Sequence, residues 1–419
     1  MAERDEAFRA LKGTYDKLPP ESRLWRELVE SGLGIAARAG YEPVIAPVLE
    51  HTEVFARGVG ESSDVVTKQM YSFTDRAGRS LTLRPEGTAG IVRAVLEHGL
   101  DRGPLPVKLA YAGPFFRQER PQKGRFRELW QFGIEALGSE GPLIDAEAVL
   151  VGERFLAEAG VRQTLLLNSI GHLAPGCRDG YLSVLVEWLE RRAAELAEED
   201  RQRVSSNPLR TFDSKEPATI AVMSEAPFVT EHLCAECKSH FDAVQQYLMD
   251  AGVSFVIEPR LVRGLDYYTR TAWEYVSEDL GAQSSVGGGG RYDGLAAALG
   301  GPPLPGIGFG IGLDRVVLAR RGEVPGGSVQ VYVIALGDDA HAAGWRLVSE
   351  LRAAGVGADL DHMGRAMKGQ MKAAARSGAR WAVILGNEEL ATGEAAVKDL
   401  VTGEQERLPL AEAVRRVST

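Results

Sequence analysis

Charged and amide side chains are concentrated around one polar loop that lies between two apolar stretches. The second stretch, "LWQFGIEAL", carries Gln131 and Glu135, which share a face if the stretch is a strand, because they are four residues apart. Arginines on paired strands can bind phosphate oxygens through two parallel hydrogen bonds. The pattern predicts a nucleotide pocket on a hairpin, and the alternative is a solvated charged hairpin. The charged residues around the loop are Arg117, Glu119, Arg120, Lys123, Arg125 and Arg127.

A second unusual stretch is "LVRGLDYYTR", residues 261–270, which we interpret as a strand that carries a fixed charge. Arg263 and Asp266 do not suit a core strand, and two adjacent tyrosines add little to a solvent-facing one. On the pattern alone, the stretch is a strand with a misplaced charge, and the role of that charge stays open.

The stretch "RPEGT", residues 84–88, places Glu86 in a turn between a predicted strand and a predicted helix. A carboxylate at this position suits the amino group of a ligand. It suits the positive end of the helix dipole equally well, so the motif alone leaves both interpretations open.

The glycine run "GIGFGIG", residues 306–312, does not form a known dinucleotide-binding loop. Its glycines occupy every second position, so no window fits G-x-G-x-x-G, and Pro305 breaks the strand that must precede that motif. The chain has no Gly-Lys dipeptide, which excludes a P-loop. Alternating glycines on a strand indicate that backbone or ligand approaches one face closely, and the pattern does not choose between the two.

The segment "HLCAECKSH" offers four residue types that bind metals, and its Cys-x2-Cys spacing suits zinc. The segment continues into an apolar-periodic helix, however, and residues three apart share a helix face without any ligand. No second pair stands out elsewhere in the sequence. We therefore predict no metal site, and small half-buried helix residues at these positions. The four residues are His232, Cys234, Cys237 and His240.

The elements that position these residues fall into successive regions. Strands and hairpin signals dominate up to about residue 145, helices dominate from there to about 255, and strands resume at residue 254. The stretch "RRGEVPGGS", residues 320–328, is polar and rich in glycine and predicts a linker. Beyond it, a β-α-β-α-β alternation predicts a small α/β domain with a largely parallel sheet.

Length and composition are those of an ordinary globular protein with two or three compact units. The chain has 419 residues, of which 44% are hydrophobic and 25% charged. No run approaches the ~20 apolar residues of a membrane helix, and the first residues lack the apolar region of a secretory signal. Three cysteines argue against a disulfide framework and indicate a reducing cytoplasm. The net charge of −10 gives no general support for nucleic-acid binding, although a local basic patch could still bind RNA.

Together these stretches resemble the class II aminoacyl-tRNA synthetases, and specifically the histidyl-tRNA synthetase family. "GYEPVIAPVLE" is similar to motif 1, "FFRQERPQKGRFRELWQFGIEALG" to motif 2 and "PGIGFGIGLDRVVLA" to motif 3, while "LVRGLDYYTR" and "GGGGRYDGL" are similar to histidine-specific elements. The resemblance implies an α+β fold with an antiparallel-sheet catalytic domain at 1–322, a helical insertion at about 165–252, and a C-terminal α/β anticodon-binding domain at 328–419. It also implies a cytoplasmic homodimer with no membrane part.

The resemblance further implies that L-histidine is activated with ATP and Mg²⁺ and then joined to tRNA(His). Arg117 and Arg263 would be catalytic at the α-phosphate, and ATP would contact Arg117, Glu119 and Arg315. The residues that would bind histidine are Glu86, Gly87, Thr88, Arg117, Gln131, Glu135, Arg263, Tyr267 and Tyr268, with Glu135 and Tyr268 on the imidazole nitrogens. The residues that would contact tRNA are Gln122, Lys123 and Arg125 in the loop and Arg365, Lys368 and Lys372 in the last domain.

The sequence departs from this family at two positions. Leu129 stands where the family usually has a phenylalanine that stacks on adenine, and Trp130 stands where it often has histidine. We hypothesise that adenine contact is weaker here, or is supplied in part by another ring. In the last domain, without the resemblance, the basic residues would be interpreted as an ordinary solvated helix face.

Two other functions are compatible with the sequence. A non-catalytic paralogue that regulates ATP phosphoribosyltransferase shares the fold, but such paralogues lose the arginine-and-tyrosine signature and the anticodon domain, which this chain retains. A nucleotide-binding RNA module without chemistry is the third possibility. Histidine-dependent exchange of pyrophosphate into ATP, followed by charging of tRNA, separates the three.

Overall fold

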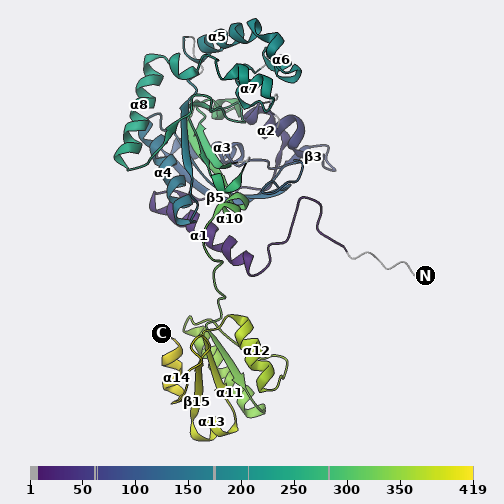
Figure 1. Ribbon diagram of the computed structural model, residues 1–419, viewed down its shortest axis with the longest axis vertical. Coiled ribbons are helices and arrows are strands. Elements are labelled where there is room, and N and C mark those ends of the chain that lie inside the picture. Colours follow the sequence, from purple (N-terminus) through teal and green to yellow (C-terminus); the bar gives the residue numbers. More distant parts are fainter. Residues whose placement is uncertain are drawn as a thin grey trace, which may run out of the picture. The chain divides into compact units, whose positions relative to one another are not determined.

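The computed structural model of the chain describes residues 8–60, 63, 65–172, 176–205, 207–281 and 284–418. The described residues group into two compact units, one made of 8–17 and 25–322 and the other of 18–24 and 323–418. The outer limits of the expected domain ranges, residues 1 and 419, lie outside the described residues. Each unit is built around its own sheet (Figure 1).

An eight-stranded sheet forms the centre of the larger unit, with strand order β1-β5-β6-β11-β10-β9-β7-β8. The inner pairs are antiparallel, and the two edge pairs, β1 with β5 and β7 with β8, are parallel. The antiparallel catalytic-type core expected from the sequence is thus confirmed. The strands are β1 (Glu42–Pro43), β5 (Val107–Phe116), β6 (Glu128–Leu137), β7 (Thr164–Ser169), β8 (Val256–Ile257), β9 (Thr269–Val276), β10 (Ser285–Arg291) and β11 (Gly306–Gly312).

The two faces of this sheet differ in character because side chains alternate along each strand. On one face Phe132 of β6 packs against Phe155 of α4 and Phe309 of β11, with ring centroids 4.8 and 5.6 Å apart. Gln131 and Glu135, at the alternate positions of β6, point to the opposite face. The apolar face is therefore covered by a helix, and the face with polar side chains is left for a site.

Helices and a small second sheet surround the large sheet. Helix α8 packs against α4, as Figure 1 shows. The three-stranded sheet has the order β2-β4-β3. The helices are α1 (Glu21–Arg38), α2 (Thr52–Val59), α3 (Thr88–Glu97), α4 (Pro142–Glu158), α8 (Ala235–Asp250), α9 (Leu295–Ala298) and α10 (Leu313–Ala319). The strands are β2 (Leu49–His51), β3 (Tyr71–Thr74) and β4 (Ser80–Leu83).

The helical segment that the sequence places at about 165–252 begins after a strand. Residues 164–169 form β7, which pairs with β9 and buries Leu165 and Leu167 in the sheet. The helices that follow are α5 (Arg178–Arg191), α6 (Glu198–Arg203) and α7 (Pro217–Met223), which pack around an apolar cluster of their own. The short apolar run "TLLLNS" is compatible with either a strand or a buried helix by pattern alone, which is why the boundary is hard to predict.

The prediction of a strand at residues 261–270 is wrong for most of its length. Regular structure begins at Thr269, where β9 starts, and residues 261–268 form a loop. The carbonyl groups of this loop are satisfied by side chains from neighbouring segments instead of by a strand. The donors are Asn168 to the carbonyl of Leu261, Arg178 to that of Tyr268 and Arg210 to that of Gly264.

The smaller unit contains a five-stranded mixed sheet with the order β13-β12-β14-β15-β16. The first three strands are parallel and confirm the predicted β-α-β-α-β alternation, whereas β15 and β16 add an antiparallel hairpin. The strands are β12 (Val331–Ala335), β13 (Ala358–Leu360), β14 (Trp381–Leu385), β15 (Glu394–Asp399) and β16 (Gln405–Pro409). The helices are α11 (Asp338–Ala353), α12 (Met367–Ser377), α13 (Asn387–Thr392) and α14 (Leu410–Val417). In neither unit is a described helix long and apolar enough to cross a membrane.

Candidate active site

An open pocket of about 600 Å³ lies against the glycine-rich strands of the larger unit. Five residues predicted to bind ATP or histidine line it: Arg117, Glu119, Gln131, Arg263 and Arg315. They come from the loop after β5, from β6, from the loop before β9, and from α10. Segments that are up to 198 residues apart (Arg117 to Arg315) thus meet in one concave site that is lined by side chains of both charges, several of them arginines.

Strand register explains why the site forms on this face of the sheet. Glu135 of β6 pairs directly with Gly308 of β11, and Gly310 of β11 pairs with Gly288 of β10. Gly288 in turn pairs with Glu274 of β9. Directly paired residues point to the same face of a sheet, so the polar residues of the outer strands are separated by glycines on the inner ones. The result is a floor without side chains between two polar walls.

The glycines of this floor give room to side chains as well as to a ligand. A Cβ atom at Gly308 would lie 1.9 Å from Oε2 of Glu135, and one at Gly288 would lie 2.9 Å from Nη1 of Arg263. A Cβ at Gly310 would meet nothing closer than 3.4 Å, and this residue lines the open pocket. Of the two interpretations that the sequence left open, close packing thus applies at Gly308 and an open ligand face at Gly310.

The two arginines predicted to be catalytic are held in place by different partners. Nε of Arg117 donates to the carbonyl of Pro85 at 2.9 Å, and Nη1 of Arg263 donates to Oε1 of Glu274 at 3.2 Å. The buried Nε of Arg263 has no hydrogen-bond partner among the described residues. Both guanidinium groups are therefore oriented by the protein and keep donors for an anion in the pocket.

A buried polar cluster adjoins the site and centres on Glu135, which is fully buried. Its carboxylate accepts hydrogen bonds from the hydroxyls of Thr88 at 2.7 Å, Tyr292 at 2.5 Å and Tyr111 at 3.4 Å. Glu86 accepts two backbone N–H groups at the start of α3, at 2.7 and 3.0 Å. Hydrogen bonds from these groups thus hold both carboxyl groups in fixed positions.

The electrostatics of this cluster favour a proton on Glu135. Burial raises the pKa of Glu135 to about 8, although the hydrogen bonds from Tyr292 and Thr88 oppose this shift. The nearby carboxyl of Glu86 raises the pKa further, and the pKa of Glu86 itself is raised, mainly by burial. Two carboxyl groups in one buried cluster therefore do not both carry a full charge at neutral pH.

This pKa shift makes stability depend on pH in a defined direction. The folded chain holds a proton on Glu135 that the unfolded chain releases above about pH 4.5, so its contribution to the unfolding free energy falls as pH rises from 4.5 to about 8. Glu135→Gln removes this dependence. Between pH 5 and pH 8, the unfolding free energy of the variant is expected to rise by about 3 kcal/mol relative to that of the wild type.

Denaturant unfolding of both proteins at the two pH values measures this gain. Leu129→Ala, a change on the same strand at a side chain that does not titrate, is the control and should give the same difference at both pH values. If the wild type and Glu135→Gln instead differ by the same unfolding free energy at pH 5 and at pH 8, that result would contradict the raised pKa of Glu135.

The other predicted histidine-binding residues lie in or beside the buried cluster and not in the lining of the open pocket. Tyr267 and Tyr268 have ring centroids 4.6 Å apart, and the ring of Tyr267 lies 5.7 Å from that of Tyr292. The guanidinium of Arg263 lies 5.8 Å from the centroid of Tyr268 and thus joins the cluster to the pocket. The predicted residues outside the open lining are Glu86, Gly87, Thr88, Glu135, Tyr267 and Tyr268.

The two positions that depart from the family pattern behave differently. Leu129 lines the pocket, as does Phe126, whose ring lies 4.7 Å from that of Tyr15. Trp130 points to the opposite face, where its ring lies 6.2 Å from that of Trp25. Only the departure at Leu129 therefore changes the pocket surface, and Phe126 is an aromatic side chain at the same site.

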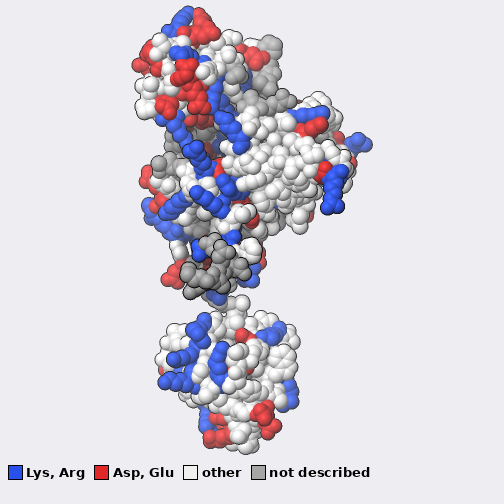
Figure 2. All heavy atoms as spheres, turned by 90° about the vertical axis from the view of Figure 1, so that its right-hand side faces the viewer, with Lys and Arg blue, Asp and Glu red and all other residues white. Residues whose placement is uncertain are grey.

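The predicted tRNA-binding residues lie in both units. Within the β5–β6 loop, Gln122 and Arg125 are joined by backbone hydrogen bonds, and Arg125 turns into the pocket, 3.4 Å from Glu119. In the smaller unit Lys368 and Lys372 are exposed on α12, and Arg365 just before it pairs with Asp361 at 2.8 Å. Figure 2 shows Lys and Arg side chains gathered over the upper part of one face of this unit, with Asp and Glu near its lower end.

Among the residues of the site that the sequence reasoning missed are Tyr292, Glu274 and Tyr111. Tyr292 lies within the quoted stretch "GGGGRYDGL", and Glu274 is a polar residue in an alternating apolar strand, so each had a detectable signal. Tyr111 had none, because a tyrosine in an apolar strand is an ordinary core residue. Its hydroxyl belongs to the site only because Gly133 and Gly87 leave it space.

Known proteins resemble this chain over nearly its whole length. A family model for histidyl-tRNA synthetase matches residues 13–316, and one for an anticodon binding domain matches residues 330–419. The histidine–tRNA ligase of Moorella thermoacetica is 50% identical over 408 residues, 96% of each chain. That of Mycobacterium tuberculosis is 50% identical over 418 residues, 98% of this chain and 97% of the relative.

Solved structures give the same result. The apo histidyl-tRNA synthetase of S. aureus is 33% identical and has a TM-score of 0.82, over 98% of this chain and 100% of that one. A Bacillus halodurans protein named as an ATP phosphoribosyltransferase regulatory subunit/histidyl-tRNA synthetase is 21% identical with a TM-score of 0.66, which shows a common fold alone. The regulatory alternative is therefore the less supported one. The chain belongs to the histidyl-tRNA synthetase family, as its motifs predicted.

Proposed function

We propose that this chain is a histidine–tRNA ligase of protein synthesis, which activates L-histidine with ATP and transfers it to the 3′ end of tRNA(His). The observation that carries the proposal is the meeting of Arg117, Arg263 and Arg315 in one pocket beside the buried cluster around Glu135. Three fixed positive charges suit the triphosphate of ATP, and the cluster suits a small polar side chain. A regulatory paralogue has no need of this combination.

In the first step, a carboxylate oxygen of histidine attacks the α-phosphorus of ATP. A new P–O bond forms, the bond to the leaving pyrophosphate breaks, and histidyl-adenylate results. Arg117 and Arg263 flank the α-phosphate and offset the negative charge that develops on its oxygens. The protein contributes mainly by holding the reactants in line. In the second step, the ribose hydroxyl at the tRNA 3′ end attacks the adenylate carbonyl, and AMP leaves.

Histidine is recognised by groups of opposite hydrogen-bonding character. A neutral imidazole presents one donor and one acceptor, and Glu135 and Tyr268 supply their complements. Glu86, Thr88 and Gln131 take the amino group, with Gly87 leaving room for Tyr111 at the turn. Tyr267 closes the pocket. The hydroxyls of Tyr292 and Tyr111 orient the carboxylate of Glu135, a role that follows from their hydrogen bonds to it.

The remaining pocket residues serve ATP. Arg315 binds the γ-phosphate, and Glu119, fixed between Arg117 and Arg125, faces the nucleotide. Mg²⁺ bound with ATP would supply positive charge that offsets the negative charge of the phosphates. The carboxylates of Glu119 and Glu274 line the pocket and are oxygen donors of the kind that Mg²⁺ takes, so the donor set fits this ion.

Binding of tRNA and assembly into a homodimer complete the proposal. Gln122, Lys123 and Arg125 meet the acceptor end, and Arg365, Lys368 and Lys372 meet the anticodon through phosphate contacts, which carry no sequence information by themselves.

Large apolar side chains near β1 and the small sheet support a second copy of the chain as partner. Ile45 is 99% exposed, Phe73 49% and Leu49 42%. Sedimentation equilibrium measures the mass in solution.

Histidine-dependent exchange of labelled pyrophosphate into ATP tests the proposed chemistry. We expect exchange with L-histidine, none without it, and subsequent charging of tRNA(His). Folded protein that binds ATP but shows no exchange would support the regulatory alternative. Exchange without charging would separate the adenylation site from the tRNA contacts and contradict only the second half of the proposal.

The hypothesis about adenine contact gives a further prediction. Leu129→Phe adds a ring to the pocket and is expected to lower the Michaelis constant for ATP about five-fold, the size of a modest base–aromatic stacking energy. Phe126→Ala is expected to raise it by a similar factor. Trp130→His lies on the opposite face and serves as the control, with no change expected. An unchanged constant for Leu129→Phe would show that the hypothesis is wrong.

A further inference from the structure

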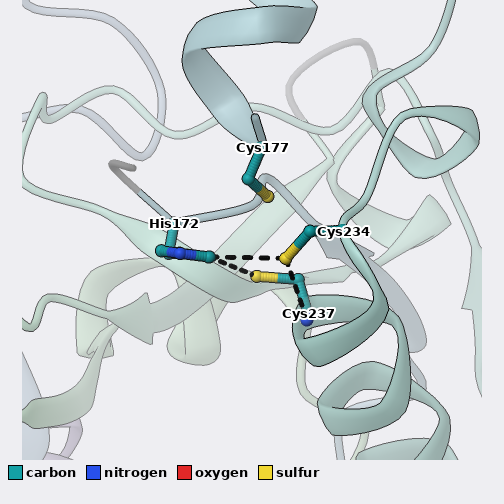
Figure 3. Close-up of side chains that lie close together, drawn as sticks. All are labelled: His172, Cys177, Cys234 and Cys237. Atoms are coloured by element: carbon teal, nitrogen blue, oxygen red, sulfur yellow. Dashed lines mark hydrogen bonds between the residues drawn. The ribbon is translucent and has the colours of Figure 1, made fainter. Parts of the chain in front are cut away.

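All three cysteines of the chain meet one histidine at the base of the helical segment (Figure 3). Each of the four residues offers one ligand atom, and the four atoms lie within 4.8 Å of one another. They come from the segment after β7, the start of α5 and the start of α8. The residues are His172, Cys177, Cys234 and Cys237.

This group differs from the one considered in the sequence. Cys234 and Cys237 belong to it, but His232 and His240 do not: the ring of His232 stacks at 5.6 Å from Tyr181, and Nε2 of His240 lies 3.5 Å from a carboxylate oxygen of Asp145. The premise that no second pair exists is wrong. The second pair is supplied by residues 172 and 177, about 60 positions earlier in the chain.

We propose that His172, Cys177, Cys234 and Cys237 bind a structural Zn²⁺ ion. A Cys₃His set fills the four positions of tetrahedral zinc and leaves none open for catalysis. Zinc–sulfur bonds of about 2.3 Å separate the sulfurs by about 3.8 Å, within the spread observed here. Nδ1 of His172 faces two of them, at 2.8 Å from Sγ of Cys237 and 3.8 Å from Sγ of Cys234. Soft thiolates with one imidazole select zinc over magnesium or calcium.

The sulfurs of the cluster lie at the starts of two helices. Cys177 is the N-cap residue of α5, and Cys234 is the N-cap residue of α8, with Cys237 in the first turn. The backbone N–H of Cys237 donates to Sγ of Cys234 at 3.5 Å. The positive ends of two helices thus converge on the cluster, where the thiolate is the form of cysteine that binds metal. Binding releases the thiol protons and leaves a net charge of −1 on the site.

The ion would fasten the helical segment to the wall of the proposed active site. Cys177 precedes Arg178, whose Nη1 donates to the carbonyl of Tyr268 at 2.7 Å. His172 follows Gly171, whose carbonyl accepts from the backbone N–H of Arg270 at 2.7 Å. Two of the four ligands are therefore one residue away from groups that hold residues 268–270. The proposed role is structural, and it does not depend on the function proposed above.

The test uses the full-length chain without a histidine tag, dialysed against Zn²⁺ and then against metal-free buffer. Elemental analysis is expected to find about one zinc per chain. Cys177→Ser and Cys234→Ser are each expected to reduce this to below about one tenth. His232→Gln is the matched control, because it removes a histidine two residues from Cys234 that lies outside the cluster, and it should retain full zinc.

Two further measurements keep the proposal testable if a serine variant does not fold. Wild-type protein reconstituted with Co²⁺ is expected to show thiolate-to-cobalt charge transfer and the intense visible bands of a tetrahedral site. After denaturation and chelation, three free thiols are expected per chain. Absence of zinc from the dialysed wild type, zinc that persists in both serine variants, or one free thiol in place of three, which marks a disulfide, would each overturn the assignment.

Discussion

Replacing Arg263 by alanine is expected to lower the rate of histidyl-adenylate formation by about 100- to 1000-fold, with a much smaller change in histidine affinity. Arg263 and Arg117 line one pocket from two separate loops, and each keeps guanidinium donors for an anion. Charge on the α-phosphate oxygens grows in the transition state, so a fixed cation there stabilises the transition state more than bound histidine. The loss should therefore appear in the rate constant.

Single-turnover kinetics of adenylate formation and equilibrium binding of histidine measure the two quantities separately. Arg260→Ala is the matched control: Arg260 lies in the same region of the chain, but its side chain is largely exposed and pairs with Glu258 at 2.9 Å. This variant should keep the wild-type rate of adenylate formation and the wild-type histidine affinity. Equal losses of rate and histidine affinity in Arg263→Ala would contradict a role at the phosphate and assign Arg263 to histidine binding.

Substituting alanine for Gly308 is the second change with a large expected effect. The added Cβ would lie 1.9 Å from Oε2 of Glu135 and 2.3 Å from the backbone carbonyl of Ile134. The carbonyl belongs to the paired strand β6 and cannot move without breaking the ladder. We expect a loss of about 3 kcal/mol of unfolding free energy, together with displacement of Glu135 and loss of histidine activation.

Gly310→Ala provides the comparison, because Gly310 is two residues away on the same face of β11. Its Cβ would meet nothing closer than Oε1 of Gln131 at 3.4 Å, so the unfolding free energy should change by less than about 1 kcal/mol. The methyl group would instead occupy the pocket and raise the Michaelis constant for ATP. Similar stability losses in Gly308→Ala and Gly310→Ala, measured by denaturant unfolding, would refute the distinction between packing and open glycines.

The sequence alone determined those features that depend on neighbouring residues. Periodicity and turn chemistry located the β-α-β-α-β alternation of the smaller unit, and strand alternation put Gln131 and Glu135 on one face. Long motifs identified the family and the catalytic-type fold. These signals are local, because the spacing of side chains along a helix or strand is fixed by backbone geometry within a few residues.

Only the tertiary structure decided features that depend on what lies across a contact. Residues 261–268 were predicted to be part of a strand, yet they form a loop in which side chains of Asn168, Arg178 and Arg210 donate to three of the backbone carbonyls. The carboxyl of Glu135 has an ordinary pKa in a peptide, and complete burial beside Glu86 raises it. Neither fact is encoded in the residues next to these positions.

The cysteines show most clearly which features the sequence determines and which the tertiary structure decides. The spacing of Cys234 and Cys237 is visible in the sequence, but a helix also produces that spacing without a metal, so the pattern alone could not choose. Folding brings His172 and Cys177 to within 4.8 Å of them. The sequence thus supplied the chemistry of single residues and their order along each element. Which distant residues complete a site was decided by tertiary packing, which places the starts of α5 and α8 beside the segment after β7, because only there do the separate segments share one environment.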